Sequence, residues 1–417
     1  MIFLFIVINI VFCSVNYLFQ NHKEYIADVP DKLYRNMLDI IEWDSRLIII
    51  RGPKGVGKST LMLQHIVRDL GRNNNKVLYC SADSTYFASH TLVETANSFV
   101  RTGGEVLMFD EIHKYDNWSR EIKEINDLHK KLKVVISGSS LLQLNDGQAD
   151  LSRRADFYDL PGLSFREYLW FKTGILFAPI EYEELMTSAG DLCSDVNSKC
   201  KPYEYFRDYL ITGYYPFSFE KTSRFRERIG QVINYTVENE LTRFKGVDIG
   251  NTRKILALLK IVSELVPFQF DIAKISKTTQ IDRVTLMKYL RYLDEAKITR
   301  NIFTELLSVT ALQKPDKILL DNTNILYALS EKEPEIGTVR ETFFCNQMVS
   351  SGHSIEYGGM KTGDYRIDGR RIIEVGGPEK DFSQFDEKNI SDGAIAADDI
   401  DWAVGRRIPL WCYGMLY

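Results

Sequence analysis

The chain carries the sequence LIIIRGPKGVGKST at residues 47–60, and the neighbouring elements can be placed by working outward from it. Leu47 to Ile50 form a short apolar, β-branched run, which is typical of a strand buried on both faces. Glycines then turn the backbone, and Lys58 opens a segment whose apolar residues recur at helical spacing. A strand, a G-x-x-x-x-G-K-S loop and a helix in this order predict a phosphate-binding loop, because a chance glycine turn rarely has this full setting.

The loop also indicates which groups would hold a nucleotide. Free backbone N–H groups and the positive end of the helix would cradle the phosphates, and the Lys58 ammonium would reach the β- and γ-phosphates. The Ser59 hydroxyl would hold Mg²⁺. The residues that we expect to bind the nucleotide are Gly52, Pro53, Lys54, Gly55, Val56, Gly57, Lys58, Ser59 and Thr60.

A second motif lies at residues 106–111, where four apolar residues are followed by Asp110 and Glu111. This is a Walker B pattern, in which Asp110 at the carboxyl end of a strand would hold Mg²⁺ through its water shell. Glu111 would polarise the attacking water. The alternative is a buried strand that ends in a solvated acidic turn, and the preceding phosphate-binding loop argues against it.

Two further groups are candidates for catalysis at the γ-phosphate. The predicted strand at 133–136 ends in Ser-Gly-Ser-Ser, and Ser137 is the candidate for a small polar sensor, although an ordinary strand-ending turn explains the segment almost as well. Downstream, Arg153 and Arg154 precede an aromatic segment. A guanidinium here, with Arg154 as the candidate, would stabilise transition-state charge within the subunit or across to a neighbour; a surface ion pair is the equal alternative.

Alternating strands and helices predict an α/β fold, with a P-loop NTPase core built on a parallel sheet over residues 21–162. Aromatic-rich helices follow over residues 163–245 as a linker or lid region. Residues 246–330 show three short helices and a hairpin, which is the order of a winged-helix domain. Residues 331–417 form a separate C-terminal α+β domain.

The third of these short helices offers a basic surface. Arg283, Lys288 and Arg291 point away from its apolar stripe, with Asp294 and Glu295 close by in the sequence. Three basic residues make a modest patch, so contact with DNA and packing against a protein both stay open.

The C-terminal region contains an Asp-Gly pair at 368–369 between two alternating runs, which predicts a hairpin. With a three-residue loop, Asp364 lies opposite Glu374 and the two carboxylates share a face of the sheet. A two-residue turn instead places them on opposite faces.

Such a pair, together with Glu341 from the preceding helix, could hold Mg²⁺ for phosphodiester cleavage. A hydrolytic site would also need a lysine two residues after Glu374, but Gly376 stands there. Lys380 could reach in from the loop. We expect an inert, structural version of the site.

Composition sets wider bounds. The 417 residues are enough for two to three domains, and a net charge of −5 gives no global attraction to nucleic acid or acidic membranes. The six cysteines form no C-x-x-C pair, which disfavours structural zinc and favours a reducing compartment. Cys193 and Cys200 could bridge if oxidised, but we expect two loop thiols.

Residues 1–20 form a hydrophobic leader, because Met1 to Phe19 is almost wholly apolar. No Lys or Arg precedes this run, so a cleaved signal would lack its basic start. Three interpretations stay open: an over-extended start codon, a membrane tether with the body in the cytoplasm, and a secretory signal. We expect a cytoplasmic protein that meets a membrane only if the leader is retained.

With these features in place, the chain resembles a large bacterial and archaeal family of AAA-type ATP-binding proteins. Its members join an AAA-like core to a winged helix and to a C-terminal domain of unknown function similar to restriction-endonuclease folds. The resemblance covers about Tyr25 to the end of the chain and is carried by residues 52–60, 110–115 with Trp118, 137–140, 209–216, 341–344 and 374–377. It implies ATP and Mg²⁺ as cofactors, with Lys58, Ser59, Asp110 and Glu111 in the roles given above.

Two functions follow as hypotheses. The first is a Mg²⁺-dependent ATPase that hydrolyses ATP to ADP and phosphate and moves its helical parts against a partner, with DNA as a candidate partner and a homo-oligomer as a candidate assembly. The second is a nucleic-acid-binding or nuclease protein in which ATP is regulatory.

Overall fold

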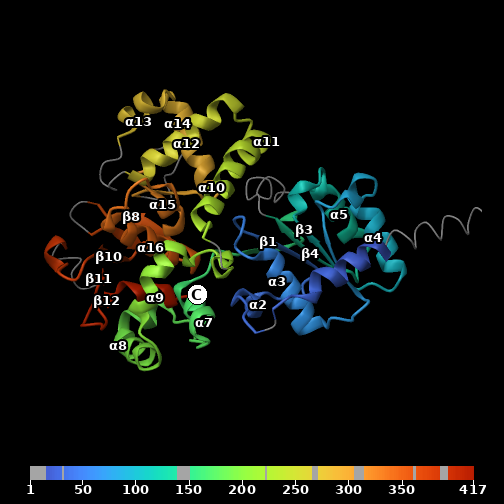
Figure 1. Cartoon of the computed structure of the whole chain (residues 1–417), viewed down its shortest axis with the longest axis horizontal. Helices are drawn as coiled ribbons and strands as arrows, with labels where there is room; N and C mark the ends of the chain where they lie inside the picture. The colour runs from blue at the N-terminus through green and yellow to red at the C-terminus, as the bar shows by residue number, and fades with distance from the viewer. Residues whose placement is uncertain are drawn as a thin grey trace, which may run out of the picture. The chain divides into compact units, whose positions relative to one another are not determined.

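The computed structural model describes residues 16–30, 32–138, 151–220, 223–264, 271–304, 314–359, 363–385 and 393–417 (Figure 1). The chain divides into two compact units, unit 1 over Met1–Pro161 and unit 2 over Gly162–Tyr417. Within the described ranges, no helix combines the length and the apolar character needed to cross a membrane. The leader up to residue 15 lies outside these ranges.

Unit 1 is built on a five-stranded sheet in the order β2-β3-β4-β1-β5, in which every neighbouring pair is parallel. The first four residues of β1 are fully buried, as expected for a strand covered on both faces. The predicted parallel α/β core is therefore confirmed. The strands are β1 (Leu47–Arg51), β2 (Val77–Ser81), β3 (Val106–Asp110), β4 (Lys133–Gly138) and β5 (Asp156–Asp159).

Helices complete the core of unit 1. Helix α4 begins with a capping box, in which the Thr91 hydroxyl accepts from the Glu94 backbone N–H and the Glu94 carboxylate accepts from the Thr91 backbone N–H. Residues 16–27 are helical, and Leu18 belongs to the core, although residues 16–20 fall within the expected leader. The elements are α2 (Met37–Ile40), α3 (Lys58–His65), η1 (Ile66–Leu70), η2 (Thr85–Ala88), α4 (Leu92–Arg101), η3 (Ile112–Lys114) and α5 (Trp118–Leu128).

Unit 2 begins with helices rich in aromatic residues. Phe165, Phe206, Tyr209 and Phe343 are buried and lie with neighbouring ring centroids 4.9–5.9 Å apart, so these aromatic side chains form part of a core. The elements are α7 (Phe165–Thr173), α8 (Tyr182–Lys199), α9 (Pro202–Asp208), η4 (Tyr209–Gly213), η5 (Pro216–Phe219), α10 (Phe225–Tyr235), η6 (Thr236–Glu240) and α11 (Leu241–Lys245).

The expectation that Cys193 and Cys200 are two loop thiols is wrong for Cys193. This residue is buried inside α8, and Cys200 follows the last residue of that helix. The sulfur nearest to Cys193 is that of Cys412, at 3.6 Å, which contacts it because the C-terminal segment packs on α8. Sequence spacing could not predict this contact, because Cys193 and Cys412 lie far apart along the chain.

Three helices and a strand pair follow. The elements are α12 (Ile249–Glu264), α13 (Ile272–Thr279), α14 (Arg283–Glu295), β6 (Thr299–Ile302) and β7 (Lys317–Leu320), and the two strands pair antiparallel. This element order is the one that the sequence predicted. The segment between the strands includes residues 305–313, which lie outside the described ranges, and the winged-helix assignment stays a prediction.

The rest of unit 2 is an α/β region with a mixed sheet in the order β12-β11-β10-β9-β8. Strands β10, β11 and β12 run parallel, whereas β8, β9 and β10 are antiparallel neighbours. The elements are α15 (Thr323–Leu329), α16 (Ile336–Ser350), β8 (Ile355–Tyr357), β9 (Tyr365–Ile367), β10 (Arg371–Gly376), η9 (Phe382–Gln384), β11 (Ala394–Ala397), β12 (Arg407–Pro409) and η10 (Leu410–Met415). The likeness of this region to a restriction endonuclease and the finer division of unit 2 stay predictions.

The hairpin between β9 and β10 has a three-residue loop. Ile367 pairs with Arg371, so residues 368–370 form the turn, with Asp368 and Gly369 both at positive φ. The same register continues to Asp364 and Glu374, which therefore share a face of the sheet. Of the two alternatives left open by the sequence, the structure selects this one.

Candidate nucleotide-binding site

The glycines of the loop between β1 and α3 meet two separate steric demands. Gly55 and Gly57 have φ of 89° and 96°, in the left-handed region that side chains disfavour. A Cβ on Gly52 would lie 2.3 Å from the Leu160 carbonyl oxygen, so no larger residue fits there. Glycine is therefore required at these three positions of the loop, by close approach at one and by backbone conformation at two.

Lys58 is the first residue of α3, and it is only 4% exposed. Its ammonium donates to the carbonyl oxygens of Gly52 and Pro53, both at 2.9 Å. The side chain thus folds back along the loop, where phosphate oxygens could replace the carbonyls as acceptors.

Asp110 ends β3 at the same edge of the sheet as the loop, because the carboxyl ends of parallel strands lie together. Its carboxylate accepts from the Ser137 hydroxyl at the end of β4 and from the Tyr79 hydroxyl of β2 at 2.6 Å. Ser59, the other predicted metal ligand, is the second residue of α3, directly after the loop. Two hydroxyls therefore orient the carboxylate of the predicted metal ligand Asp110.

The motifs did not identify Tyr79. Tyr79 reaches Asp110 because β2 pairs with β3. This pairing places Ser81 beside Asp110 and brings the Tyr79 hydroxyl within reach of the carboxylate. Burial raises the pKa of the Tyr79 hydroxyl strongly, and the Asp110 charge adds to this effect. The hydroxyl therefore stays protonated and acts as a hydrogen-bond donor.

Glu111 follows β3 with φ of 52°, a value unusual for a residue other than glycine. Its Oε2 lies 3.4 Å from Nε2 of His113, which is buried. His113 had no predicted role, and it contacts the predicted water-polarising carboxylate.

The two other predicted catalytic residues lie in different surroundings. Ser137 is fully buried and contacts Asp110. Its strand, β4, lies between β3 and β1 in the sheet, and β1 leads into the loop. Arg154 forms a partly exposed ion pair with Asp127, with Nε 3.3 Å from Oδ1, which matches the alternative named for it. Residues 139 and 140 lie outside the described ranges. The catalytic roles of Ser137 and Arg154 stay predictions.

A second acidic cluster lies in unit 2. Nζ of Lys317 is 2.5 Å from Glu341 and 4.0 Å from Asp364, and Nζ of Lys380 is 2.6 Å from Glu374. Burial raises the pKa of Glu374, and the Asp364 charge adds to this, while Lys380 opposes it. Across the described residues, no three His, Cys, Asp or Glu side chains gather as a metal site.

The fold and the site together define a class: unit 1 is a P-loop nucleotide-binding domain. Residues 44–169 match the family model described as the AAA domain, so this part of the chain is an AAA-type domain. Residues 203–335 match a second family model, described as a domain of unknown function (DUF8612). Among curated proteins, the comparison found no match.

Solved structures give weaker likenesses. The Walker-type ATPase of Pyrococcus abyssi is 10% identical, with a TM-score of 0.39, over 73% of this chain and 99% of that one. DnaA of Aquifex aeolicus, solved with AMPPCP, is 15% identical with a TM-score of 0.25, over 67% and 87%. A DNA replication initiation factor is 16% identical with a TM-score of 0.26, over 62% and 85%. The fold assignment rests on the strand order, the loop and the family match.

Proposed function

We propose that the protein is a Mg²⁺-dependent ATPase that hydrolyses ATP to ADP and phosphate. The observation that carries this proposal is the meeting of the glycine loop with Asp110 at one edge of the sheet, where the Asp110 carboxylate accepts hydrogen bonds from Tyr79 and Ser137. Hydroxyl and carboxylate oxygens are the ligands that Mg²⁺ prefers, and the glycine loop before α3 offers backbone N–H groups to phosphates. The residues present therefore fit both groups.

Each residue then has a task. The Lys58 ammonium moves its hydrogen bonds from the loop carbonyls to phosphate oxygens, and Ser59 and Asp110 hold the metal. Mg²⁺, when bound, neutralises charge on the phosphate oxygens. Glu111 orients and polarises the attacking water, and release from His113 would bring its carboxylate toward the phosphates.

Nucleotide state would act on a partner through the parts of the chain outside the AAA-type domain. Closure of the site around the γ-phosphate is the switch, as in other nucleotide-driven proteins. A homo-oligomer would allow Arg154 of one subunit to serve the site of a neighbour. DNA is the candidate partner, through Arg283, Lys288 and Arg291 of α14.

Two substitutions test the ATPase. Lys58→Ala should abolish ATP binding, measured by calorimetry with Mg²⁺ present, whereas Lys76→Ala, at the opposite ends of the strands, should bind like wild type. Glu111→Gln should keep ATP binding while phosphate release stops, because the amide cannot polarise water as a carboxylate does. Retained hydrolysis in Glu111→Gln would remove the assigned base.

A metal-dependent nuclease is the second candidate, and the register that pairs Asp364 with Glu374 favours it. Lys380 lies against Glu374, where Gly376 supplies no side chain. We favour an inert cluster, because Lys317 and Lys380 already neutralise the carboxylates. Cutting of duplex DNA with Mg²⁺ or Mn²⁺ that disappears in Asp364→Ala would establish the nuclease instead.

A further inference from the structure

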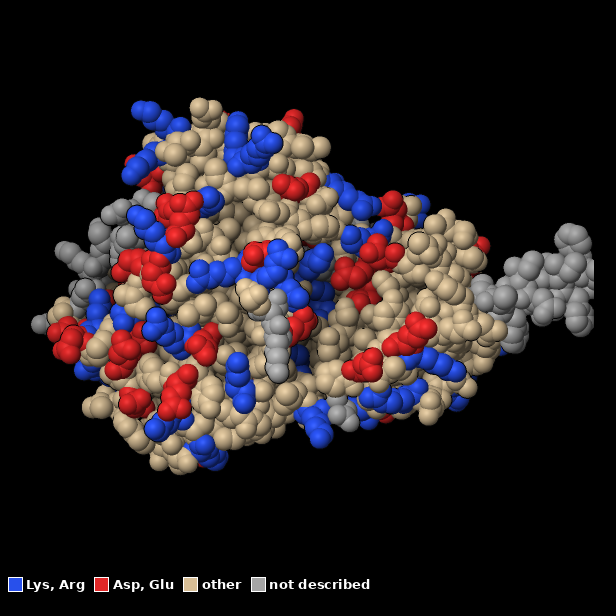
Figure 2. All heavy atoms as spheres, viewed as in Figure 1, with Lys and Arg blue, Asp and Glu red and all other residues tan. Residues whose placement is uncertain are grey.

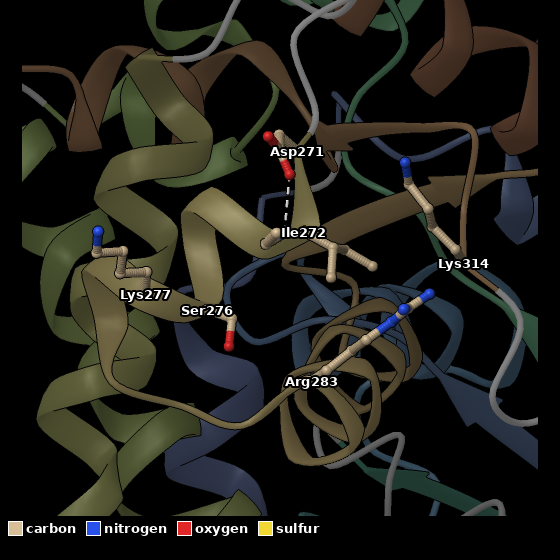
Figure 3. A pocket seen from close by; sticks show the side chains of 7 residues that line it. Asp271, Ile272, Ser276, Lys277, Arg283 and Lys314 are labelled. Atoms are coloured by element: carbon tan, nitrogen blue, oxygen red, sulfur yellow. Dashed lines mark hydrogen bonds between the residues drawn. The ribbon is translucent and has the colours of Figure 1, made fainter.

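A pocket of about 500 Å³ opens between the start of α13 and the start of α14 in unit 2. Figure 3 shows its lining, in which Lys277 extends from one side and Arg283 and Lys314 from the other. Asp271 is the one acidic residue of the lining. Three cations against one carboxylate make the pocket electropositive.

The helix ends themselves contribute little to this charge. Asp271 accepts from the backbone N–H of Ala273 at 2.8 Å, and Asp282 caps α14 in the same way through Val284 at 3.1 Å. Both helix dipoles are thus partly neutralised by side chains of their own helices. The side-chain cations carry the positive potential.

The basic residues of α13 and α14 differ in whether they already form an ion pair within the protein. Within the described part of the chain, Lys277, Arg283 and Lys288 take part in no ion pair, whereas Arg291 is bound by Glu295 at 2.8 Å. Glu295 also contacts Lys245 at 3.3 Å. Of the three residues that the sequence suggested for DNA, Arg283 is therefore more available than Arg291.

The arrangement of the charges argues for a polymer. In Figure 3 the ammonium of Lys277 and the guanidinium of Arg283 point in different directions rather than toward one point. A single small anion would need converging donors, whereas a backbone of successive phosphates suits donors that are spread apart. Figure 2 shows several Lys and Arg side chains over this end of unit 2.

The helices have a shape that suits duplex DNA. A three-residue turn, residues 280–282, joins α13 to α14, and the apolar side of α14 is buried. Its other side exposes Lys288 together with Val284, which is 52% exposed. In such a pair the second helix enters the major groove while residues beside it contact phosphates.

We propose that the α13–α14 surface binds the phosphate backbone of duplex DNA, with Lys277 and Arg283 as phosphate contacts. This inference names the partner of the proposed ATPase, and it is testable without hydrolysis. Each phosphate contact releases counterions, so the binding constant falls with salt by a slope of about 0.9 for each contact. The salt slope therefore counts the contacts.

The test uses the full chain and a fluorescein-labelled duplex of about 20 base pairs, followed by anisotropy between roughly 50 and 200 mM salt. The double variant Lys277→Ala/Arg283→Ala should bind on the order of tenfold more weakly at the lowest salt and lose about 1.8 from the slope. Both residues are exposed, so thermal unfolding should match wild type. Arg291→Ala, on the same helix, should lose much less.

Three results of the anisotropy titrations would overturn the proposal. They are no duplex binding by wild type at the lowest salt, an unchanged slope in the double variant, and a loss of binding in Arg291→Ala as large as in the double variant. Polyglutamate that displaces the duplex at equal charge concentration would also overturn it and would point to an acidic protein partner. If Lys58→Ala still binds the duplex, the surface acts independently of the nucleotide; if wild type hydrolyses ATP without binding DNA, only this inference fails.

Discussion

Two acidic clusters in this chain differ in what neutralises them. At the sheet edge of unit 1, the Asp110 carboxylate accepts hydrogen bonds from two hydroxyls, and within the described residues no Lys or Arg pairs with it. In unit 2, the carboxylates of Glu341 and Glu374 contact lysine ammonium groups. Hydroxyls orient a charge without cancelling it, whereas ammonium groups take the place that a cation would need. Unit 1 is therefore the better candidate for a metal.

Among the tests of this difference between the two clusters, Asp110→Asn has the largest expected effect. Loss of this carboxylate should lower ATP turnover by about 10²–10³-fold, because the metal that we propose it holds would stabilise the transition-state charge. Steady-state phosphate release measures the effect. Glu105→Gln, at the other end of β3, removes an equal charge and should leave turnover near wild type. A similar loss in both variants would show a general charge effect instead.

Lys317→Met tests the lysine-neutralised cluster. Lys317 is 1% exposed, so its removal leaves Glu341 buried without its partner and should destabilise the protein by about 3–5 kcal/mol. Urea unfolding measures this loss. The double variant Lys317→Met/Glu341→Met should recover most of it, because neither charge then remains. If the single variant is as stable as wild type, Lys317 does not neutralise Glu341 to any measurable extent. The proposed difference between this cluster and the one in unit 1 is then wrong.

Tyr79→Phe tests the role of the hydroxyl groups around Asp110 in unit 1. The 2.6 Å hydrogen bond to Asp110 orients the carboxylate, so its loss should raise the Mg²⁺ concentration for half-maximal turnover about tenfold, with a smaller change in kcat. Turnover titrated with Mg²⁺ gives both numbers. Tyr25→Phe, on a ring that packs against Tyr79, is the matched control. An unchanged Mg²⁺ dependence in Tyr79→Phe would separate Tyr79 from the metal.

The smallest effect is a pH dependence from Glu374, whose pKa burial raises above the ordinary 4.5. The folded state then holds a proton that the unfolded chain releases, so this group lowers stability as pH rises from 4.5 through the raised pKa. Glu374→Gln should remove that part of the decline. Urea unfolding of both proteins at about pH 5 and about pH 7 measures it. A variant that declines as steeply as wild type would leave Glu374 without this role.

Parts of the fold and site were predictable because local patterns carry them. The alternation of strands and helices predicted the parallel core, and the loop with Asp110 predicted a P-loop domain, since both depend on residues close in sequence. The register of Asp364 with Glu374 was narrowed to two alternatives, because a turn of two or three residues changes which side chains share a face. Only the pairing of Ile367 with Arg371 chose between them.

What the sequence could not supply is the set of partners around each charge. Tyr79 and Lys317 carry no motif, and they reach Asp110 and Glu341 because β2 pairs with β3 and because β7 packs against α16. Local residue chemistry thus established that a carboxylate follows a buried strand. The packing of distant segments established whether that carboxylate keeps its charge for a metal or is neutralised by a lysine, because electrostatic interactions depend on distance in space and not on separation along the chain.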